Sequence, residues 1–354
     1  MPSGDRRGAA RAAFLADCGL QDAAVIPLAA DASFRRYFRV TGGGQSLICM
    51  DAPPGQEKPR AFLRLAQRLT AAGFSAPRVF RHDLAQGFLL LEDFGDLTFS
   101  SLLAQGASPD KLYALATDCL ISLHRQPWRG QIRLAAYSLP VLLREAALLT
   151  DWFWPEARGA ACPAAVRRDY LRAWRNMLDQ PGLPATLVLR DYHVDNLMLL
   201  PARDGVRACG LLDFQDALLG SPAYDLASLL EDARRDVPEE LAAEMRRRYL
   251  NAFPETDPAR FTRWMTLLAA QRHAKVLGIF VRLFRRDGKA AYLRHLPRVA
   301  GLLERHLHTP VLAPLQRWVA ENGLDVTAAA ASLAPQACMP ADAGAKSGSE
   351  GKPA

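Results

Sequence analysis

Three oxygen-bearing side chains occur at a spacing that suits phosphoryl transfer. Asp191 and Asn196 lie five positions apart between short apolar stretches, and Asp213 follows 17 positions later at the end of another apolar stretch. Transfer of phosphate from ATP needs a carboxylate that orients the attacking hydroxyl and accepts its proton, and hard oxygen ligands that hold Mg²⁺. Asp and Asn alone are typical of ordinary turns. The two apolar strands and the second Asp favour the chemical interpretation instead.

The surrounding pattern predicts a β-rich part to about residue 96, followed by a mostly helical part with these two loops inserted. Strands are expected at 24–28, 46–50 and 88–92, and residues 31–40 are expected to form a small-residue turn that runs into a strand. Residues 41–45 are expected to form a hairpin turn, and residues 58–72 a helix. Short strands at 187–190 and 208–212 precede the loops. Helical periodicity covers residues 9–20, 109–126, 138–153, 163–179, 223–235, 238–252, 258–285 and 288–308. The fold class is therefore α+β, and the polar tail at 333–354 is expected to be disordered.

Composition excludes several classes of protein. The chain has 354 residues, of which 50% are hydrophobic and 23% are charged, so it can bury a core without disulfide or metal staples. The six cysteines form no CxxC motif, which disfavours a thiolate zinc site and favours free thiols. No apolar run reaches the length of about 18 residues that a membrane span needs. The N-terminal apolar stretch ends at Asp17, too early for a signal peptide, which predicts a cytoplasmic protein.

Positive charge is concentrated in one late segment. Residues 260–308 contain eleven Lys or Arg and only two acids, whereas the whole chain has a net charge of +7. A nucleic-acid partner is one interpretation, but no zinc-finger or RNA-recognition signature accompanies the charge, and we expect no such partner. A solvated helical face is the commoner cause of such a pattern. A basic wall that faces an anionic small molecule is the functional alternative.

The two loops resemble those of the aminoglycoside phosphotransferase and choline-kinase group, whose members have a bilobal, protein-kinase-like fold. Residues 190–196 resemble the H-G-D-x-H-x-x-N loop of that group, and residues 211–227 resemble its I-D-F/W-x-x-A-x-x-G-x-P-x-x-D-L-A segment. Within the group, residues 31–39 and 50–54 resemble the cell-wall-recycling kinases that phosphorylate the anomeric hydroxyl of N-acetylmuramate and N-acetylglucosamine. Residues 271–280 and 292–298 also fit that subgroup.

The resemblance implies roles for five residues of the two loops. Asp191 matches the catalytic base, while Asn196 and Asp213 match the ligands of the metal. His193 matches a histidine that braces the loop, and Asp225 matches an aspartate that hydrogen-bonds the catalytic loop from the start of a helix. For His193 and Asp225, a purely structural role is the favoured interpretation. The group also implies ATP and Mg²⁺ as cofactors. The change of pattern near residue 96 predicts a first lobe over residues 1–96 and a second lobe over residues 97–332.

In this group the loop that binds the nucleotide is usually rich in glycine. Residues 31–36, which resemble that loop, contain no glycine. Ser33, Arg35 and Arg36 are therefore the candidates to bind phosphate through their side chains, since guanidinium groups bind phosphate well. Solvated arginines in a hairpin are the alternative. Residues 88–94 resemble the hinge that binds adenine through its backbone, which places Glu92 at the nucleotide without requiring its side chain.

A second departure concerns the lysine that kinases carry on the third strand. Residues 46–51 contain no lysine, so Arg35, Arg36 or Lys58 is expected to replace it. If none does, a nucleotide-binding regulator without catalysis becomes the competing hypothesis. The intact loops favour an enzyme.

The resemblance implies a small amino sugar as substrate, and the lack of a long apolar run predicts no membrane partner. Aminoglycosides, choline and other sugars are the alternative acceptors, although polycationic aminoglycosides fit poorly beside a basic segment. Arg272, His273 and Lys275 are expected on a solvent-exposed helix face, and a contact with the lactyl carboxylate of N-acetylmuramate is the alternative. Trp152 and Trp154 are expected in the core, with stacking on a sugar ring as the alternative.

Overall fold

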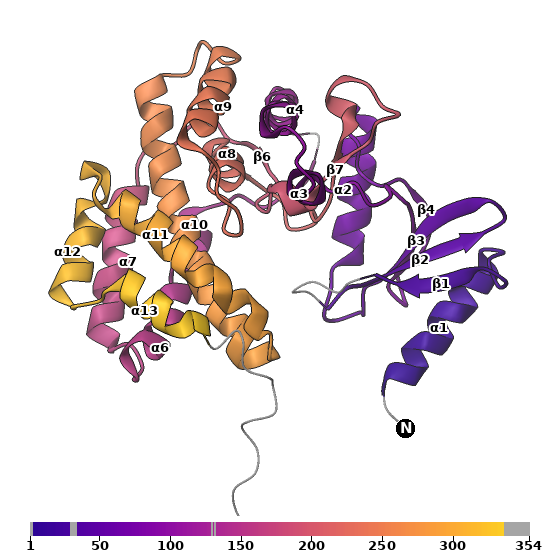
Figure 1. Ribbon diagram of the computed structural model, residues 1–354, viewed down its shortest axis with the longest axis horizontal. Coiled ribbons are helices and arrows are strands. Elements are labelled where there is room, and N and C mark those ends of the chain that lie inside the picture. The colour runs from indigo at the N-terminus through magenta and orange to yellow at the C-terminus, as the bar shows by residue number, and fades with distance from the viewer. Residues whose placement is uncertain (1–2, 29–33, 129, 131, 336–354) are drawn as a thin grey trace, which may run out of the picture. The chain divides into compact units, whose positions relative to one another are not determined.

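The computed structural model describes residues 3–28, 34–128, 130 and 132–335, and it has an α+β fold (Figure 1). Contacts divide the chain into two compact units. The first unit comprises residues 1–136, 184–230 and 238–256, and the second comprises residues 137–183, 231–237 and 257–354. The lobe boundary at residue 96 stays a prediction. Most of the tail expected at 333–354 lies outside the described residues, because the description ends at residue 335.

An antiparallel sheet of five strands in the order β1-β2-β3-β5-β4 forms the N-terminal part of the first unit (Figure 1). The strands are β1 (Ala24–Pro27), β2 (Arg36–Gly42), β3 (Gln45–Asp51), β4 (Val79–Asp83) and β5 (Phe88–Glu92). The predicted turn between β2 and β3 is formed by Gly43 and Gly44, which both have the positive φ that a tight hairpin requires. Side chains of helix α1 pack with alternate residues of β2, β3 and β5 in one core cluster.

The rest of the first unit is helical apart from two short ladders. Its helices are α1 (Ser3–Asp17), α2 (Pro59–Ala71), α3 (Phe99–Ala104), α4 (Pro109–His124), α8 (Ala223–Leu230) and α9 (Glu239–Asn251). The first ladder pairs β6 (Thr186–Val188) with β9 (Leu218–Gly220), and the second pairs β7 (Leu197–Leu199) with β8 (Cys209–Leu211). Short 3-10 turns cover Val194–Asn196 and Gly205–Ala208. These ladders carry the loops with the candidate site residues.

The second unit is helical throughout its described part. Its α-helices are α5 (Leu139–Ala146), α6 (Trp154–Arg158), α7 (Ala164–Leu178), α10 (Pro258–Asp287), α11 (Leu296–Leu307), α12 (Ala313–Glu321) and α13 (Val326–Leu333). A π-helical turn covers Leu149–Phe153, and 3-10 turns cover Ala290–His295 and Pro310–Leu312. Trp154 is buried in this unit and packs at an angle on Trp318, whereas Trp152 is half-buried.

Helix α10 is the central element of the second unit. The Asp257 side chain caps its first turn, and Gly288 ends it with a φ of 68°, as the sequence signals for a helix start and stop require. Residues 267–278 are buried without a break, so all sides of the helix are covered there. The solvent-exposed face predicted for Arg272, His273 and Lys275 is therefore wrong.

Burial of these polar side chains is possible because other segments supply partners, as buried charges require. Lys275 Nζ lies 3.4 Å from Glu145 Oε1, and Gln271 donates to the carbonyl of Leu142 at 3.0 Å. His273 Nε2 lies 2.8 Å from Glu231 Oε2. These partners come from α5 and from the segment that follows α8, far away in the sequence, so the charge pattern of α10 alone did not reveal them.

Gly278 on α10 allows a close backbone contact with the segment before the π-helical turn. A Cβ atom at this position would lie 2.2 Å from the carbonyl oxygen of Leu148. We expect Gly278→Ala to lower the free energy of unfolding by about 1–3 kcal/mol, because a backbone neighbour cannot rotate away. Gly301→Ala in α11 is the matched control, since a Cβ there meets nothing within 4 Å. This control should gain up to about 1 kcal/mol from helix propensity. Urea unfolding monitored by circular dichroism measures both changes, and equal stability of the two variants would contradict the packing argument.

The described cysteines are free thiols, in agreement with the expectation from their spacing. They are Cys18, Cys49, Cys119, Cys162 and Cys209, while Cys338 lies outside the described residues. Across the described part of the chain, no helix combines the length and the apolar character that a bilayer span requires.

Candidate active site

The loop that contains Asp191 leaves β6 in a strained backbone conformation. Arg190 has a φ of 74°, in the left-handed region that non-glycine residues rarely adopt and that costs about 1–3 kcal/mol. The buried carboxylate of Asp225, in the first turn of α8, accepts hydrogen bonds from the backbone N–H groups of Leu189 and Arg190 at 2.6 and 2.8 Å. Such charge-assisted bonds offset the strain. Asp225 thus fixes the backbone immediately before Asp191.

Asn196 is oriented by the same loop. Its side-chain Nδ2 donates to the carbonyl of Asp191 at 2.9 Å and lies 3.3 Å from His193 Nε2. The backbone N–H of Asn196 donates to the carbonyl of His193 at 2.9 Å. Because the amide nitrogen is used within the loop, the amide oxygen is the atom of Asn196 that suits a cation. His193 is buried beneath this turn, which fits a bracing residue.

Asp213 follows β8 and lies next to the Asn196 segment. Leu197 pairs with Leu211 in the ladder between β7 and β8, and the N–H of Leu212 donates to the carbonyl of Asn196 at 3.0 Å. The ladder therefore brings the end of the Asp191 loop and the start of the Asp213 loop together. Asp213 itself has a φ of 55°, the second non-glycine residue with a positive φ in the described chain. Strained residues of this kind cluster at functional sites.

Arg35, the residue before β2, contacts the Asp213 carboxylate. Its Nη2 lies 2.6 Å from Asp213 Oδ1, and its Nε lies 3.4 Å from Glu57 Oε2. Glu57 Oε1 also accepts the backbone N–H of Phe34 at 3.0 Å, so Glu57 fixes the entrance to β2. The Arg35 side chain is only 9% exposed. An arginine in a solvated hairpin, the alternative considered above, does not describe this residue.

The ionisation of this group follows from its neighbours. Burial is the largest effect on Arg35 and by itself lowers the pKa, but the oxygens of Tyr37, Asp213 and Glu57 together raise the pKa above its ordinary value. Removal from water raises the pKa of Tyr37 to about 12. Arg35 is therefore charged and Tyr37 is neutral at physiological pH. The charged guanidinium lies beside the carboxylate that is the predicted metal ligand.

Arg36 points to a different partner. Its Nη2 lies 2.5 Å from Oδ2 of Asp51, which is fully buried at the end of β3, and Arg7 makes a second ion pair with the same carboxylate. Arg36 is the first residue of β2, whereas Arg35 precedes the strand, and their side chains contact different partners. The third strand, on which kinases carry a lysine, ends here in Asp51, and two arginines compensate the charge of Asp51. Ser33 lies outside the described residues.

Glu92 and Lys58, the remaining candidates from the sequence, also lie in the first unit. The Glu92 carboxylate makes an ion pair with Arg203 and accepts the backbone N–H of Arg78 at 3.3 Å, so its side chain is engaged within the protein. Lys58 Nζ is 3.5 Å from the Asp216 carboxylate, and the two side chains are 76% and 46% exposed. The structure brings Arg35, rather than Lys58 or Arg36, to Asp213.

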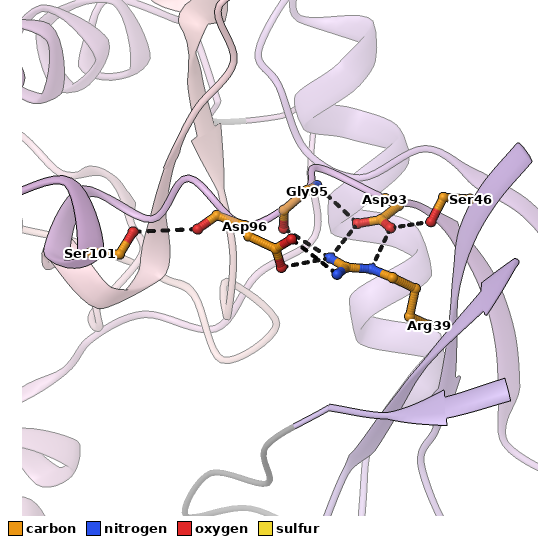
Figure 2. Close-up of polar contacts among 6 residues, drawn as sticks. All are labelled: Arg39, Ser46, Asp93, Gly95, Asp96 and Ser101. Carbon is orange, nitrogen blue, oxygen red and sulfur yellow. Dashed lines mark hydrogen bonds and ion pairs between the residues drawn. The ribbon is translucent and has the colours of Figure 1, made fainter.

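A polar network that sequence reasoning missed holds the segment after β5 (Figure 2). Arg39 on β2 contacts Asp93 at 2.7 Å and Asp96 at 2.9 Å, and the Ser46 hydroxyl donates to Asp93 at 2.5 Å (Figure 2). Burial alone raises the pKa of Asp93, but the hydrogen bonds from Ser46 and Arg39 outweigh it and the pKa is lowered. The signal in the sequence was the acidic turn at 93–96. The network fixes the segment that resembles the kinase hinge.

The donor set fits Mg²⁺. Asp213 supplies carboxylate oxygens and Asn196 supplies an amide oxygen, and both types are ligands that Mg²⁺ prefers. Asp213 Oδ1 accepts hydrogen bonds from Arg35 and from Gln215 Nε2, the latter at 2.9 Å, so this oxygen already faces positive charge. The roles of Asp191, Asn196 and Asp213 as base and metal ligands stay predictions.

Comparison with known proteins assigns the family. Residues 24–264 match the model of a family described as the phosphotransferase enzyme family, which covers more than half of the chain. The chain belongs to the phosphotransferase enzyme family. It is accordingly an enzyme that transfers phosphate, as the two loops predicted.

Two curated relatives extend over most of this phosphotransferase. A protein of Caulobacter vibrioides named N-acetylmuramate/N-acetylglucosamine kinase is 36% identical, with 90% of this chain and 97% of that protein covered. A protein of Pseudomonas aeruginosa with the same name is 40% identical, with 83% of this chain and 87% of that protein covered. The recognised resemblance to kinases of this group is confirmed.

Solved structures support the fold. A choline/ethanolamine kinase family protein from Mesorhizobium loti has a TM-score of 0.58 at 17% identity, with 89% of this chain and 99% of that chain covered. The ADP-bound aminoglycoside phosphotransferase APH(2″)-Ib has a TM-score of 0.55 at 15% identity, with 83% of this chain and 97% of that chain covered. The predicted α+β, protein-kinase-like fold class is confirmed.

Proposed function

We propose that this phosphotransferase transfers the γ-phosphoryl group of ATP to the anomeric hydroxyl of N-acetylmuramate and N-acetylglucosamine. The observation that carries the choice of substrate is the name shared by four curated relatives at 35–40% identity. The loop geometry supports the chemistry independently, because a fixed backbone positions Asp191 and a β ladder holds Asn196 beside the Asp213 segment.

In the proposed reaction, Asp191 orients the anomeric hydroxyl and accepts its proton as the oxygen attacks the γ-phosphorus. The new O–P bond forms while the bond from the γ-phosphorus to the bridging oxygen of ADP breaks. Asp225 acts through the backbone, since its two hydrogen bonds keep Asp191 at a constant position. Arg35 offers the phosphates a charged guanidinium held by Glu57. The rate then derives mainly from positioning and charge compensation.

Mg²⁺ belongs to the proposal as the ion that Asn196 and Asp213 hold. When bound, it neutralises charge on the nucleotide phosphates. Arg35 already compensates the charge of the Asp213 carboxylate at 2.6 Å in the absence of the ion. We further propose that the enzyme acts in the cytoplasm, where ATP is abundant. With an anomeric amino sugar as acceptor, its role there would be to recycle cell-wall sugars. Neither a nucleic acid nor a membrane is part of the proposed reaction.

An acceptor panel with coupled detection of ADP tests the proposal. We expect ADP release with N-acetylmuramate and N-acetylglucosamine, and little with choline or an aminoglycoside. The product should lose its reducing end, because phosphate at the anomeric oxygen blocks ring opening, whereas phosphate on any other hydroxyl leaves the sugar reducing. The methyl glycoside of N-acetylglucosamine, which lacks a free anomeric hydroxyl, is the matched control and should not react.

Each other outcome contradicts a defined part of the proposal. Turnover with choline or an aminoglycoside alone would show that the enzyme uses a different acceptor within the same enzyme family. A phosphorylated product that still reduces would reject the anomeric position. Nucleotide binding without ADP release on any acceptor would favour the non-catalytic regulator.

A further inference from the structure

Two histidines and a glutamate outside the catalytic loops converge in the second unit. His273 Nε2 lies 2.8 Å and His306 Nε2 lies 2.7 Å from the same atom, Glu231 Oε2. One ligand atom from each residue lies within 4.8 Å of the other two. Glu231 directly follows α8, His273 is in the middle of α10, and His306 is in the last turn of α11. The proposed phosphoryl transfer uses none of these residues.

We propose that Glu231, His273 and His306 bind one transition-metal ion of the zinc class, with water as the fourth ligand. Two imidazole nitrogens and one carboxylate oxygen form a ligand set that suits Zn²⁺ and disfavours Mg²⁺, which prefers oxygen ligands. This site is therefore distinct in chemistry from the pair of Asn196 and Asp213.

The geometry is close to what a tetrahedral ion requires. At the usual zinc-ligand bond lengths, neighbouring ligand atoms lie about 3.3 Å apart. The present N···O distances of 2.8 and 2.7 Å are shorter, so small side-chain rotations make room for an ion. The imidazole rings of His273 and His306 are stacked at 17°, with centroids 5.7 Å apart, and so present their Nε2 atoms from neighbouring positions.

Access and protein support also fit a metal site. The side chain of His273 is 2% exposed, so its ring is fixed by packing, whereas those of Glu231 and His306 are 13% and 15% exposed. An ion and its water ligand therefore have a route from the solvent side of the cluster. A bound ion would cross-link α10, α11 and the segment after α8, and binding to the folded state alone would raise the stability of the protein.

Metal binding by the full-length enzyme tests this inference without an activity assay. The protein is stripped with a chelator, exchanged into excess Mg²⁺ to saturate hard-oxygen sites, and titrated with CoCl₂. We expect one Co²⁺ per chain, with the intense visible absorption of a four-coordinate ion, displacement by one equivalent of ZnCl₂, and a rise in the melting temperature with either metal.

Variants separate this cluster from other ligands in the chain. Glu231→Gln keeps the shape and a hydrogen-bonding group, and His306→Gln removes one nitrogen ligand at a partly exposed position. Each should weaken Co²⁺ binding at least tenfold and abolish the metal-dependent rise in melting temperature, while the melting temperature in chelator identifies any loss of folding. His308→Gln is the control, because His308 is two residues away, its side chain is 67% exposed, and it pairs with Glu304 instead of Glu231.

The alternative is a hydrogen-bonded cluster without a metal. Absence of a four-coordinate Co²⁺ spectrum in the folded wild-type protein would overturn the inference. Binding that Glu231→Gln and His306→Gln retain at wild-type strength would also overturn it, since the ion would then lie at the thiols or at the catalytic carboxylates. Failure of the sugar panel leaves this result unaffected, because the metal measurements use no nucleotide or sugar.

Discussion

Asp191→Asn is expected to lower kcat by about 10²–10⁴-fold while the affinity for nucleotide stays within about twofold of wild type. The amide fills the same volume, but it cannot accept the proton of the acceptor hydroxyl. Asp225 and the Asn196 side chain contact backbone atoms of Leu189, Arg190 and Asp191, so the loop should retain its shape. The loss should therefore appear in the chemical step and not in nucleotide binding.

Steady-state ADP release with a saturating sugar measures kcat, and fluorescence titration with an ATP analogue measures nucleotide affinity. Asp204→Asn makes the same chemical change on an exposed carboxylate in the connection between β7 and β8, and it should preserve both quantities. Wild-type turnover in Asp191→Asn would reject Asp191 as the base. A loss of nucleotide affinity equal to the loss of turnover would instead indicate that Asp191 binds the donor.

The two loops that hold the candidate site residues were predictable from the sequence because each is encoded locally. Asp191 and Asn196 share one turn, and Asp213 ends an apolar strand, so spacing and patterning were enough to place them together. The β2–β3 hairpin was predictable for the same reason, since its glycines specify the turn. Features that depend on neighbouring residues can therefore be predicted from the sequence alone.

The missed elements have weak local patterns. Strand β4 (Val79–Asp83) is an edge strand whose central residues are exposed, so the hydrophobic alternation that marks a strand is absent. Helices α3, α12 and α13 span only 6 to 9 residues, too short for a clear helical period. The segment expected as a helix over 138–153 instead divides into α5 and a π-helical turn opposite Gly278.

Partners distant in the sequence account for the other differences. Arg35 is buried because Asp213, 178 positions away, supplies a carboxylate, and Lys275 is buried because Glu145 does the same. Charge alone predicts exposure for both side chains. Only the tertiary arrangement reveals that each charge has a counter-charge within contact distance, which is why the basic character of α10 alone predicts a solvated face.

The contact between Arg35 and Asp213 predicts a large effect of Arg35 on nucleotide binding. The third strand has no lysine, and among the three proposed replacements only Arg35 contacts Asp213. We expect Arg35→Gln to raise the KM for ATP by about 10–100-fold, which corresponds to loss of a charge-assisted hydrogen bond of about 1.5–3 kcal/mol. The KM for the sugar should change by less than about threefold, because the guanidinium faces the donor phosphates in the proposed reaction.

A merely structural role for Arg35 predicts different results. Loss of an ion pair alone would lower the melting temperature and leave the KM for ATP unchanged, whereas a phosphate-binding role shifts that KM even where the fold is intact. Arg35→Lys should recover part of the affinity, since it retains the charge but not the paired geometry of a guanidinium. Arg81→Gln on the exposed edge strand β4 is the control for removing one positive charge. If Arg36→Gln raised the KM for ATP more than Arg35→Gln does, the phosphate contact would belong to Arg36, and the ion pair between Arg36 and Asp51 would have to open when nucleotide binds.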